Sequence, residues 1–196
     1  MRDYKEAMKW NLLAADQGLA AAQVNIASMY YDGDGVTQDY KEAMALAAVE
    51  HWNRGTGGLF AQAPFQALDD PRDRVLAYLD FRRALVRGTA PEFTCLLGTM
   101  AQEVFDTWPG LRQACDDGIQ AHADTVARDL ALAKALYAPQ ASWDPGALAL
   151  FTQATLQGAF ILAKAQGSAE VVFPCLDHLR QNVAHLLGAD PAPALT

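Results

Sequence analysis

The stretch Asp39–Arg54, DYKEAMALAAVEHWNR, decides how this 196-residue chain is organised. Its first six residues, DYKEAM, repeat residues 3–8 without a change, and after Met44 the two copies share little. A repeat that has drifted by mutation would differ in patches along its whole length. Six identical residues followed by an abrupt break instead indicate two sequences that share one helix. We therefore interpret 39–54 as a junction helix that belongs to two folds.

The composition predicts an all-α protein. Hydrophobic residues make up 52% of the chain, which is enough for a sizeable core. Ala and Leu are abundant, β-branched runs are few, and Gly and Pro stand between the apolar segments, a pattern that favours helices separated by discrete breaks. Serine is scarce and stands in no nucleophile motif, and the four histidines form no zinc-helix pair. The sequence therefore predicts no enzyme, no metal site and no cofactor.

The net charge and the lengths of the apolar runs limit the possible partners and cellular location of the protein. The formal net charge of -8 argues against nucleic acid or an anionic membrane as a partner. Apolar runs fall short of the roughly 20 residues that span a bilayer, and the polar start has no signal-peptide core, so a cytoplasmic protein is expected. Three cysteines, at widely spaced positions without a Cys-x-x-Cys pair, indicate reduced structural thiols.

Helical periodicity and breaks divide the chain. In the first part, amphipathic helices are expected at 4–17 and 20–31, with a glycine-rich reversal at 32–35. The segment 55–58, GTGG, should end or loosen the junction helix. The helices expected beyond that point span 71–87, 93–105, 107–137, 145–165 and 170–187. A tail at 189–196 is expected to be disordered.

The segments 22–30, AQVNIASMY, and 33–44, GDGVTQDYKEAM, resemble the Sel1-like repeat, a helix-turn-helix solenoid related to tetratricopeptide repeats. The resemblance covers about residues 1–46 and implies a scaffold for protein interaction at 1–44. Solenoid units need on the order of three repeats to bury a continuous core. This short solenoid fragment is therefore expected to depend on the part of the chain that follows.

The rest of the chain resembles the C-terminal domain of TetR-family transcriptional regulators. The resemblance rests on 94–103 (TCLLGTMAQE), the long helix after Pro109, 152–162 and 177–179, and 45–52 resembles the family's linking helix. It implies a ligand-binding and dimerisation domain at 45–188. The family's DNA-reading helix-turn-helix has no counterpart before it, so DNA binding is expected to be lost.

Two interpretations of the function follow from these resemblances. The leading one is an engineered, non-enzymatic fusion of a Sel1-like fragment to a TetR-like domain through a shared continuous helix. The alternative is a natural TetR-like small-molecule sensor whose Sel1-like segment binds a protein partner.

The TetR-like resemblance implies a ligand cavity between the central helices. An apolar cavity of this kind would select a hydrophobic small molecule. Large side chains on the helices that would line it could equally be ordinary core residues. The candidates are Tyr78, Phe93, Met100, Trp108, Phe151 and Thr155.

The resemblance also implies a homodimer in which the last two helices pair with their copies. Independently, each of these helices carries an apolar stripe, and Gly158 would allow close approach of a partner. Pro174 puts the start of the final helix in doubt. The interface candidates are Leu148, Phe151, Thr155, Gly158, Ala159, Leu162, Leu176, Leu179, Val183 and Leu186.

Overall fold

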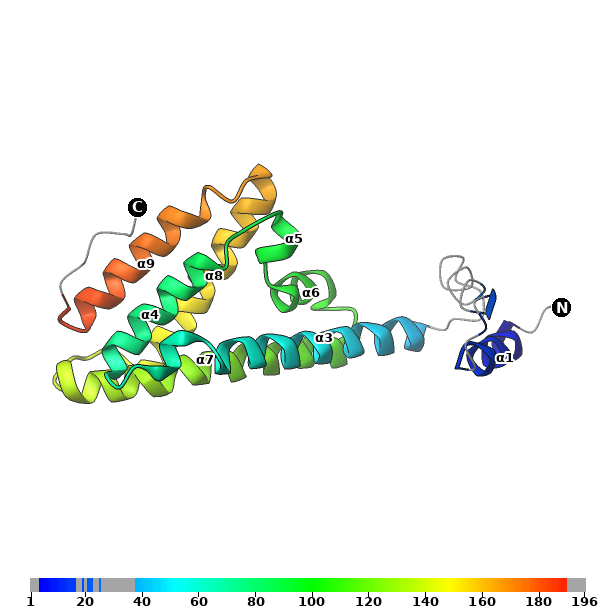
Figure 1. Cartoon of the computed structure of the whole chain (residues 1–196), viewed down its shortest axis with the longest axis horizontal. Coiled ribbons are helices and arrows are strands. Elements are labelled where there is room, and N and C mark those ends of the chain that lie inside the picture. Colours follow the sequence, from blue (N-terminus) through cyan, green and yellow to red (C-terminus); the bar gives the residue numbers. More distant parts are fainter. Residues whose placement is uncertain (1–3, 17–18, 20, 23–24, 26–37, 190–196) are drawn as a thin grey trace. The chain divides into compact units, whose positions relative to one another are not determined.

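The computed structural model describes residues 4–16, 19, 21–22, 25 and 38–189, and the elements along these residues are helices (Figure 1). The all-α class is thereby confirmed for this part of the chain. Two compact units are present, residues 1–48 and 49–196. Most of the predicted helix at 20–31, the reversal at 32–35 and all but the start of the 189–196 tail lie outside the described residues.

The first elements are α1 (Tyr4–Asp16) and α3 (Gln38–Ala61), and the boundary between the two units falls inside α3. The expected end of the junction helix at residues 55–58 is wrong, because α3 continues through its three glycines. Glycine keeps its backbone donor and acceptor, and the Gln62 N–H still donates to the Gly58 carbonyl at 3.1 Å. Packing at Phe60 against the core offsets the cost of about 1 kcal/mol per helical glycine.

The second unit contains the remaining helices. A short 3₁₀ helix, η1, comes first and directly precedes α4. The elements in chain order are η1 (Pro64–Ala67), α4 (Pro71–Ala84), α5 (Ala90–Phe93), α6 (Leu96–Val104), α7 (Pro109–Tyr137), α8 (Pro145–Gln166) and α9 (Val172–Leu186).

The single helix predicted at 93–105 is two helices in the structure. Thr94 and Cys95 have extended backbones, with ψ of 161° and 122°. This break changes the chain direction, so that α5 packs against α8 while α6 packs against α7. Residues on either side of the break thus serve two different helix contacts, which a continuous helix could not do.

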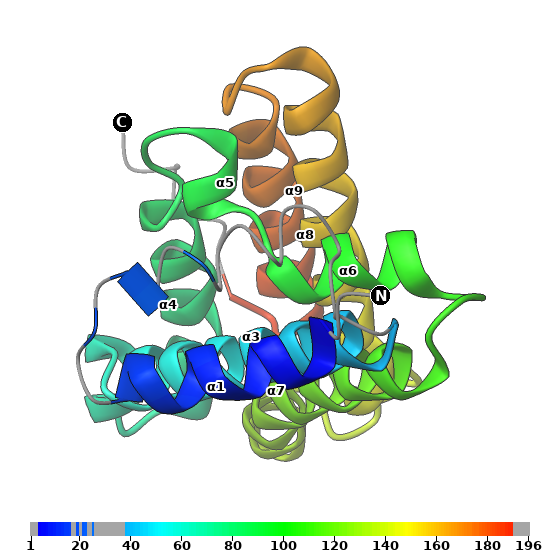
Figure 2. The same cartoon turned by 90° about the vertical axis from the view of Figure 1, so that its right-hand side faces the viewer.

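Helix α7 is the centre of the second unit. It packs against α4, α6 and α8, while α8 also packs against α9, and α9 against α4. Figures 1 and 2 show α8 and α9 side by side. Leu111, Leu130 and Leu156 are fully buried in these contacts. Burial of each such side chain stabilises the fold by roughly 1.5–3 kcal/mol.

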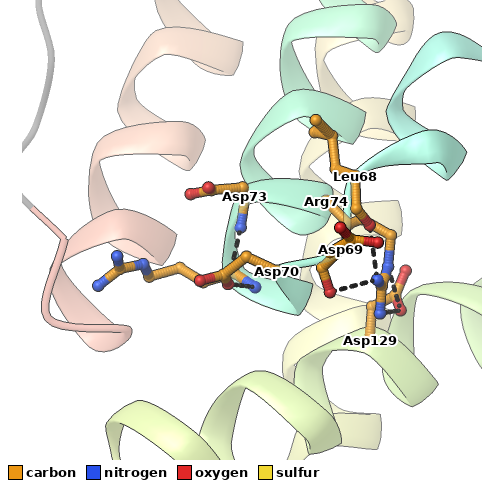
Figure 3. Close-up of polar contacts among 7 residues, drawn as sticks. Leu68, Asp69, Asp70, Asp73, Arg74 and Asp129 are labelled. Atoms are coloured by element: carbon orange, nitrogen blue, oxygen red, sulfur yellow. Dashed lines mark hydrogen bonds and ion pairs between the residues drawn. The ribbon is translucent and has the colours of Figure 1, made fainter.

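Polar contacts fix the start of α4 and join it to α7 (Figure 3). The Asp70 carboxylate caps α4 by accepting hydrogen bonds from the N–H groups of Arg72 and Asp73, at 2.8 and 3.4 Å. The Arg74 guanidinium binds the Asp129 carboxylate of α7 at 2.9 Å and also donates to two carbonyl oxygens of the preceding turn. This half-buried ion pair holds α4 and α7 in register.

A reciprocal pair of salt bridges joins α4 to α9. Arg83 of α4 binds Asp177 at 3.0 Å, and Arg180 of α9 binds Asp80 at 2.6 Å. Each helix contributes one cation and one anion, so sliding α9 along α4 would break both bridges.

Helix α9 begins at Val172, so Pro174 lies in its first turn, where a missing N–H removes no intrahelical hydrogen bond. The doubt about the start of this helix is thereby resolved. Helix α8 is long and apolar enough to cross a membrane by length and composition, with a mean hydropathy of 1.4. Its packing against α5, α7 and α9 identifies it as a core helix of the second unit.

Candidate functional site

A cavity of about 180 Å³ lies within the second unit. Six helices, α3 to α8, and the α5–α6 break supply its walls. Its lining residues are Trp52, Asn53, Thr56, Leu59, Phe60, Arg82, Leu85, Glu92, Phe93, Thr94, Cys95, Leu97, Gly118, Ile119, His122, Gln153, Gln157 and Phe160.

Two glycines allow polar side chains to reach the cavity between closely packed helices. A Cβ at Gly98 would stand 2.0 Å from Gln157 Oε1, and a Cβ at Gly118 would stand 2.7 Å from Asn53 Oδ1. Any larger residue at these two positions would displace the amides of Gln157 and Asn53. Because Gly98 and Gly118 have no side chains, the amides of Gln157 and Asn53 have room at the cavity wall.

His122 is the most perturbed group at this site. Its ring packs on Phe60 with centroids 4.6 Å apart, and its Nε2 lies 2.9 Å from the Tyr78 hydroxyl. That hydroxyl accepts a hydrogen bond from Gln153 Nε2 at 3.2 Å. Burial, together with the charge of Arg82, lowers the pKa of His122 from 6.5 to about 4. The ring is therefore neutral at pH 7.

These hydrogen bonds are compatible with both neutral tautomers of His122. The Tyr78 hydroxyl has two acceptor lone pairs, so besides accepting from Gln153 it can either donate to Nε2 or accept from an Nε2–H group. Nδ1 has no hydrogen-bond partner among the described residues, so this nitrogen is available to a bound molecule as a donor in one tautomer and as an acceptor in the other.

A smaller cavity, of about 150 Å³, also borders Phe60 and His122. Both cavities are lined by these two residues. Tyr78 and Asp129 line the smaller cavity, and Asp129 is the partner of Arg74 in the α4–α7 ion pair. The Phe60–His122 ring pair therefore borders both spaces, and the smaller one reaches the contact that joins α4 to α7.

Two charged side chains line the larger cavity. Glu92 accepts hydrogen bonds from the backbone N–H and the hydroxyl of Thr89, at 2.6 and 2.8 Å, and these bonds lower the pKa of Glu92. Arg82 lies over the Phe60 ring, 5.3 Å from its centroid. Within residues 38–189 its guanidinium has no hydrogen bond and no carboxylate partner. The Glu92 carboxylate thus has hydrogen-bond partners within the chain, whereas the Arg82 guanidinium has none among residues 38–189.

The structure brings together only some of the predicted pocket residues. Phe93 lines the larger cavity and Tyr78 the smaller one. Met100 on α6, Trp108 before α7, and Phe151 and Thr155 on α8 line neither. Phe151 is 46% exposed, because it is on the outward face of α8.

The sequence interpretation did not identify the polar residues of the cavity. Asn53, Arg82 and Gln157 carry no local signal, since each is one polar residue in an amphipathic helix. His122 did give a signal, because it stands in the apolar stripe of the long helix where a hydrophobic residue would be expected. Cys95, expected to be a structural thiol, is half-buried at the cavity wall.

The predicted dimer residues divide into an inner and an outer set. Leu148 and Ala159 on α8 and Leu176, Leu179 and Val183 on α9 are buried in the core of the chain itself. Little of their surface is thus left for a partner, because the chain itself covers them. A period of 3.6 residues fixes an apolar face but does not say which neighbour covers it.

The outer set is on α8. Phe151, Leu162 and Ile161 are 45–46% exposed, and a Cβ at Gly158 would meet nothing within 4 Å. Thr155 lies between them and donates its hydroxyl hydrogen to the Phe151 carbonyl at 2.9 Å. Leu186, the last predicted α9 contact, is half-buried against the core. The outward side of α8 is thus an apolar strip with room above its glycine.

Comparison with known proteins assigns the second unit. Residues 71–179 match the family model of the tetracyclin repressor-like C-terminal domain. The fold resembles that of a TetR transcriptional regulator from Chloroflexus aurantiacus J-10-fl, with a TM-score of 0.66, 23% identity and coverage of 94% of this chain and 97% of that one. It also resembles Escherichia coli NemR in its reduced form, with a TM-score of 0.57, 20% identity and coverage of 91% and 95%. No protein with a curated description matches the sequence.

These findings correct the interpretation of the chain as an engineered fusion. The shared fold extends over nearly the whole length of a natural regulator, so the two units need no splice to explain them. The matching family model covers residues 71–179 and gives no support to a Sel1-like repeat in the first unit. The expected loss of DNA reading, argued from the missing helix-turn-helix and the net charge, stays a prediction. The six-residue repeat alone was insufficient evidence for a join. With more than half of its length matched, the chain belongs to the family of regulators that carry a tetracyclin repressor-like C-terminal domain.

Proposed function

We propose that this protein is a natural transcriptional regulator that responds to a small hydrophobic molecule bound in the 180 Å³ cavity. The cavity is the observation that carries the proposal. It combines apolar walls with a few polar groups that point to it, the composition that ligand sites in proteins have. Family membership supports regulation of transcription in place of catalysis.

The arrangement around His122 suggests how binding would be transmitted. A molecule in the cavity would contact Phe60 and His122, which also line the second cavity beside the α4–α7 ion pair. A shift of these rings would therefore act on the contact between Arg74 and Asp129. A ligand changes the state of a protein only if it binds one arrangement of these rings more tightly than the other.

A ligand screen with a blocked-cavity variant tests the proposal. Leu59 lines the cavity and is 45% exposed, so Leu59→Trp should fill the entrance without disturbing the core. Leu132→Trp makes the same change at a 54% exposed position of α7 that lines neither cavity. Compounds that raise the melting temperature of the wild type should lose this effect only in Leu59→Trp. Ligand shifts of equal size in both variants would refute the cavity as the site.

We also propose that the domain extends over residues 45–188 and forms a homodimer through the outward strip of α8, defined by Phe151, Thr155, Gly158 and Leu162. Val49 and Leu187, near the two ends of this range, are both buried, with exposures of 2% and 0%. TetR-like domains generally dimerise, and an apolar strip on an outer helix is the kind of patch that a two-fold axis covers.

Light scattering with size-exclusion chromatography tests the dimer. Phe151→Glu should convert a dimer to a monomer, because it would bury a charge in an apolar interface. His178→Glu, on the exposed side of α9, is the matched control and should remain a dimer. A wild type that is monomeric at micromolar concentration would contradict the proposal.

Protein binding by residues 1–44 stays a prediction. Unchanged regulation in a reporter assay after deletion of residues 1–37 would contradict it.

A further inference from the structure

The polar groups of the larger cavity favour one class of ligand. Three of them, Arg82, Asn53 and Gln157, have side chains without a hydrogen-bond partner within residues 38–189, although all three line the cavity. Arg82 is half-buried and in contact with Phe60. A guanidinium in such surroundings has lost part of its hydration without gaining a carboxylate, so a bound anion would restore what it lacks.

The second charged group of the cavity does not offset Arg82. Glu92 is exposed, and its Oε2 accepts both hydrogen bonds from Thr89. It forms no ion pair with Arg82 within 4.0 Å, in contrast to the paired arginines of the α4–α9 contact. The positive charge of Arg82 also acts on His122, whose protonation it disfavours. The part of the cavity wall formed by Arg82 is therefore the side where an anion is stabilised.

The volume of the cavity limits the body of the ligand. A protein cavity of roughly 150 Å³ lined by apolar side chains holds one benzene molecule. The 180 Å³ found here thus has room for a single ring with one small substituent. Phe93 and Phe160 form part of the wall with their rings 6.1 Å apart, and aromatic rings pack well against such faces.

Resting on the proposed function, we infer that the cavity takes a small aromatic monocarboxylate, with its ring among the aromatic side chains and its carboxylate on the Arg82 guanidinium. The amides of Asn53 and Gln157 supply further donors at the cavity wall. A neutral alcohol of the same shape would gain the apolar contacts but not the ionic one. An amine of the same shape would meet Arg82 as a like charge.

Isothermal titration at pH 7 with benzoate, benzyl alcohol and benzylamine tests this inference on the full chain. Benzoate should bind the wild type at least about tenfold more tightly than benzyl alcohol, the order expected of a charge-assisted hydrogen bond. Arg82→Gln should weaken benzoate about tenfold to hundredfold and leave benzyl alcohol nearly unchanged. Arg82→Lys, which keeps the charge, should retain the preference for benzoate.

Arg87→Gln is the matched control. It removes the same charge just beyond the end of α4, at an exposed position that does not line the cavity, and should leave all three affinities unchanged.

The outcomes separate the inference from the proposed function. Benzyl alcohol or benzylamine binding as tightly as benzoate would overturn the inference and leave a small-molecule cavity in place. An unchanged benzoate affinity in Arg82→Gln would do the same. Failure of all three probes would also overturn the inference, and the proposed function would fall with it only if the wider screen with Leu59→Trp gave no cavity ligand.

Discussion

Replacement of His122 by glutamine should change how the stability of the protein depends on pH. The pKa of His122 is about 4 in the folded protein, against 6.5 for a free histidine, because burial and Arg82 disfavour the charged ring. Between these two values the unfolded chain binds a proton that the folded chain does not. Stability therefore rises with pH through this window, and acidification from pH 7 to 4 favours the unfolded state.

The magnitude follows from the shift. Each unit of pKa difference corresponds to about 1.36 kcal/mol, so His122 accounts for at most about 3 kcal/mol of stability lost between pH 7 and 4. Below pH 4 the folded protein binds the proton as well, and this contribution to the slope ends. The glutamine side chain of His122→Gln would keep an acceptor near the Tyr78 hydroxyl, so the substitution should remove the titration at little structural cost.

Urea unfolding of wild type and His122→Gln at several pH values, at one fixed protein concentration, measures the effect. The difference between their unfolding free energies should change by about 2–3 kcal/mol from pH 7 to 4, in the direction that favours the variant at low pH. His178→Gln, at an exposed position of α9, controls for the loss of a histidine as such. A difference that is constant across this range would refute a buried neutral His122.

Three further outcomes are expected. Leu156→Ala, at a position with 0% exposure, should lower the unfolding free energy by about 2–5 kcal/mol in urea melts. Gly98→Ala should displace the Gln157 side chain, and titration calorimetry should then detect weaker ligand binding while the melting temperature stays nearly constant, since a helical alanine offsets the local strain. A double-mutant cycle on Asp80 and Arg180 should give a coupling of about 1 kcal/mol, and a coupling near zero would contradict a contribution of this bridge to stability.

The corrected interpretation of the repeat has a physical basis. The residues YKEAM are helical in both copies, in α1 and in α3, because Lys, Glu, Ala and Met all favour helix. A shared local preference does not require a shared origin, nor does a sharp end of identity require a join. Only the fold of the whole chain could decide this, and it matches natural regulators across both units.

Local preferences in the sequence determined the helices themselves. The apolar spacing along residues 109–137 and the proline starts at Pro71, Pro109 and Pro145 fixed the existence and the beginning of α4, α7 and α8. These signals are local, since a first-turn proline and a 3.6-residue period act within a single helix. The all-α class follows from them without knowledge of any contact.

Tertiary structure decided how these helices meet, and with that the site. The glycines at 55–58 remain helical because Phe60 packs on the core, and the 93–105 segment breaks because its two halves have different neighbours. Arg82 and Gln157 line one cavity only because α4, α6 and α8 are packed together. The apolar strip of α8 is exposed because α9 covers only the other side of that helix. Periodicity fixes which residues share a face, whereas long-range packing fixes what that face meets, and binding depends on the latter.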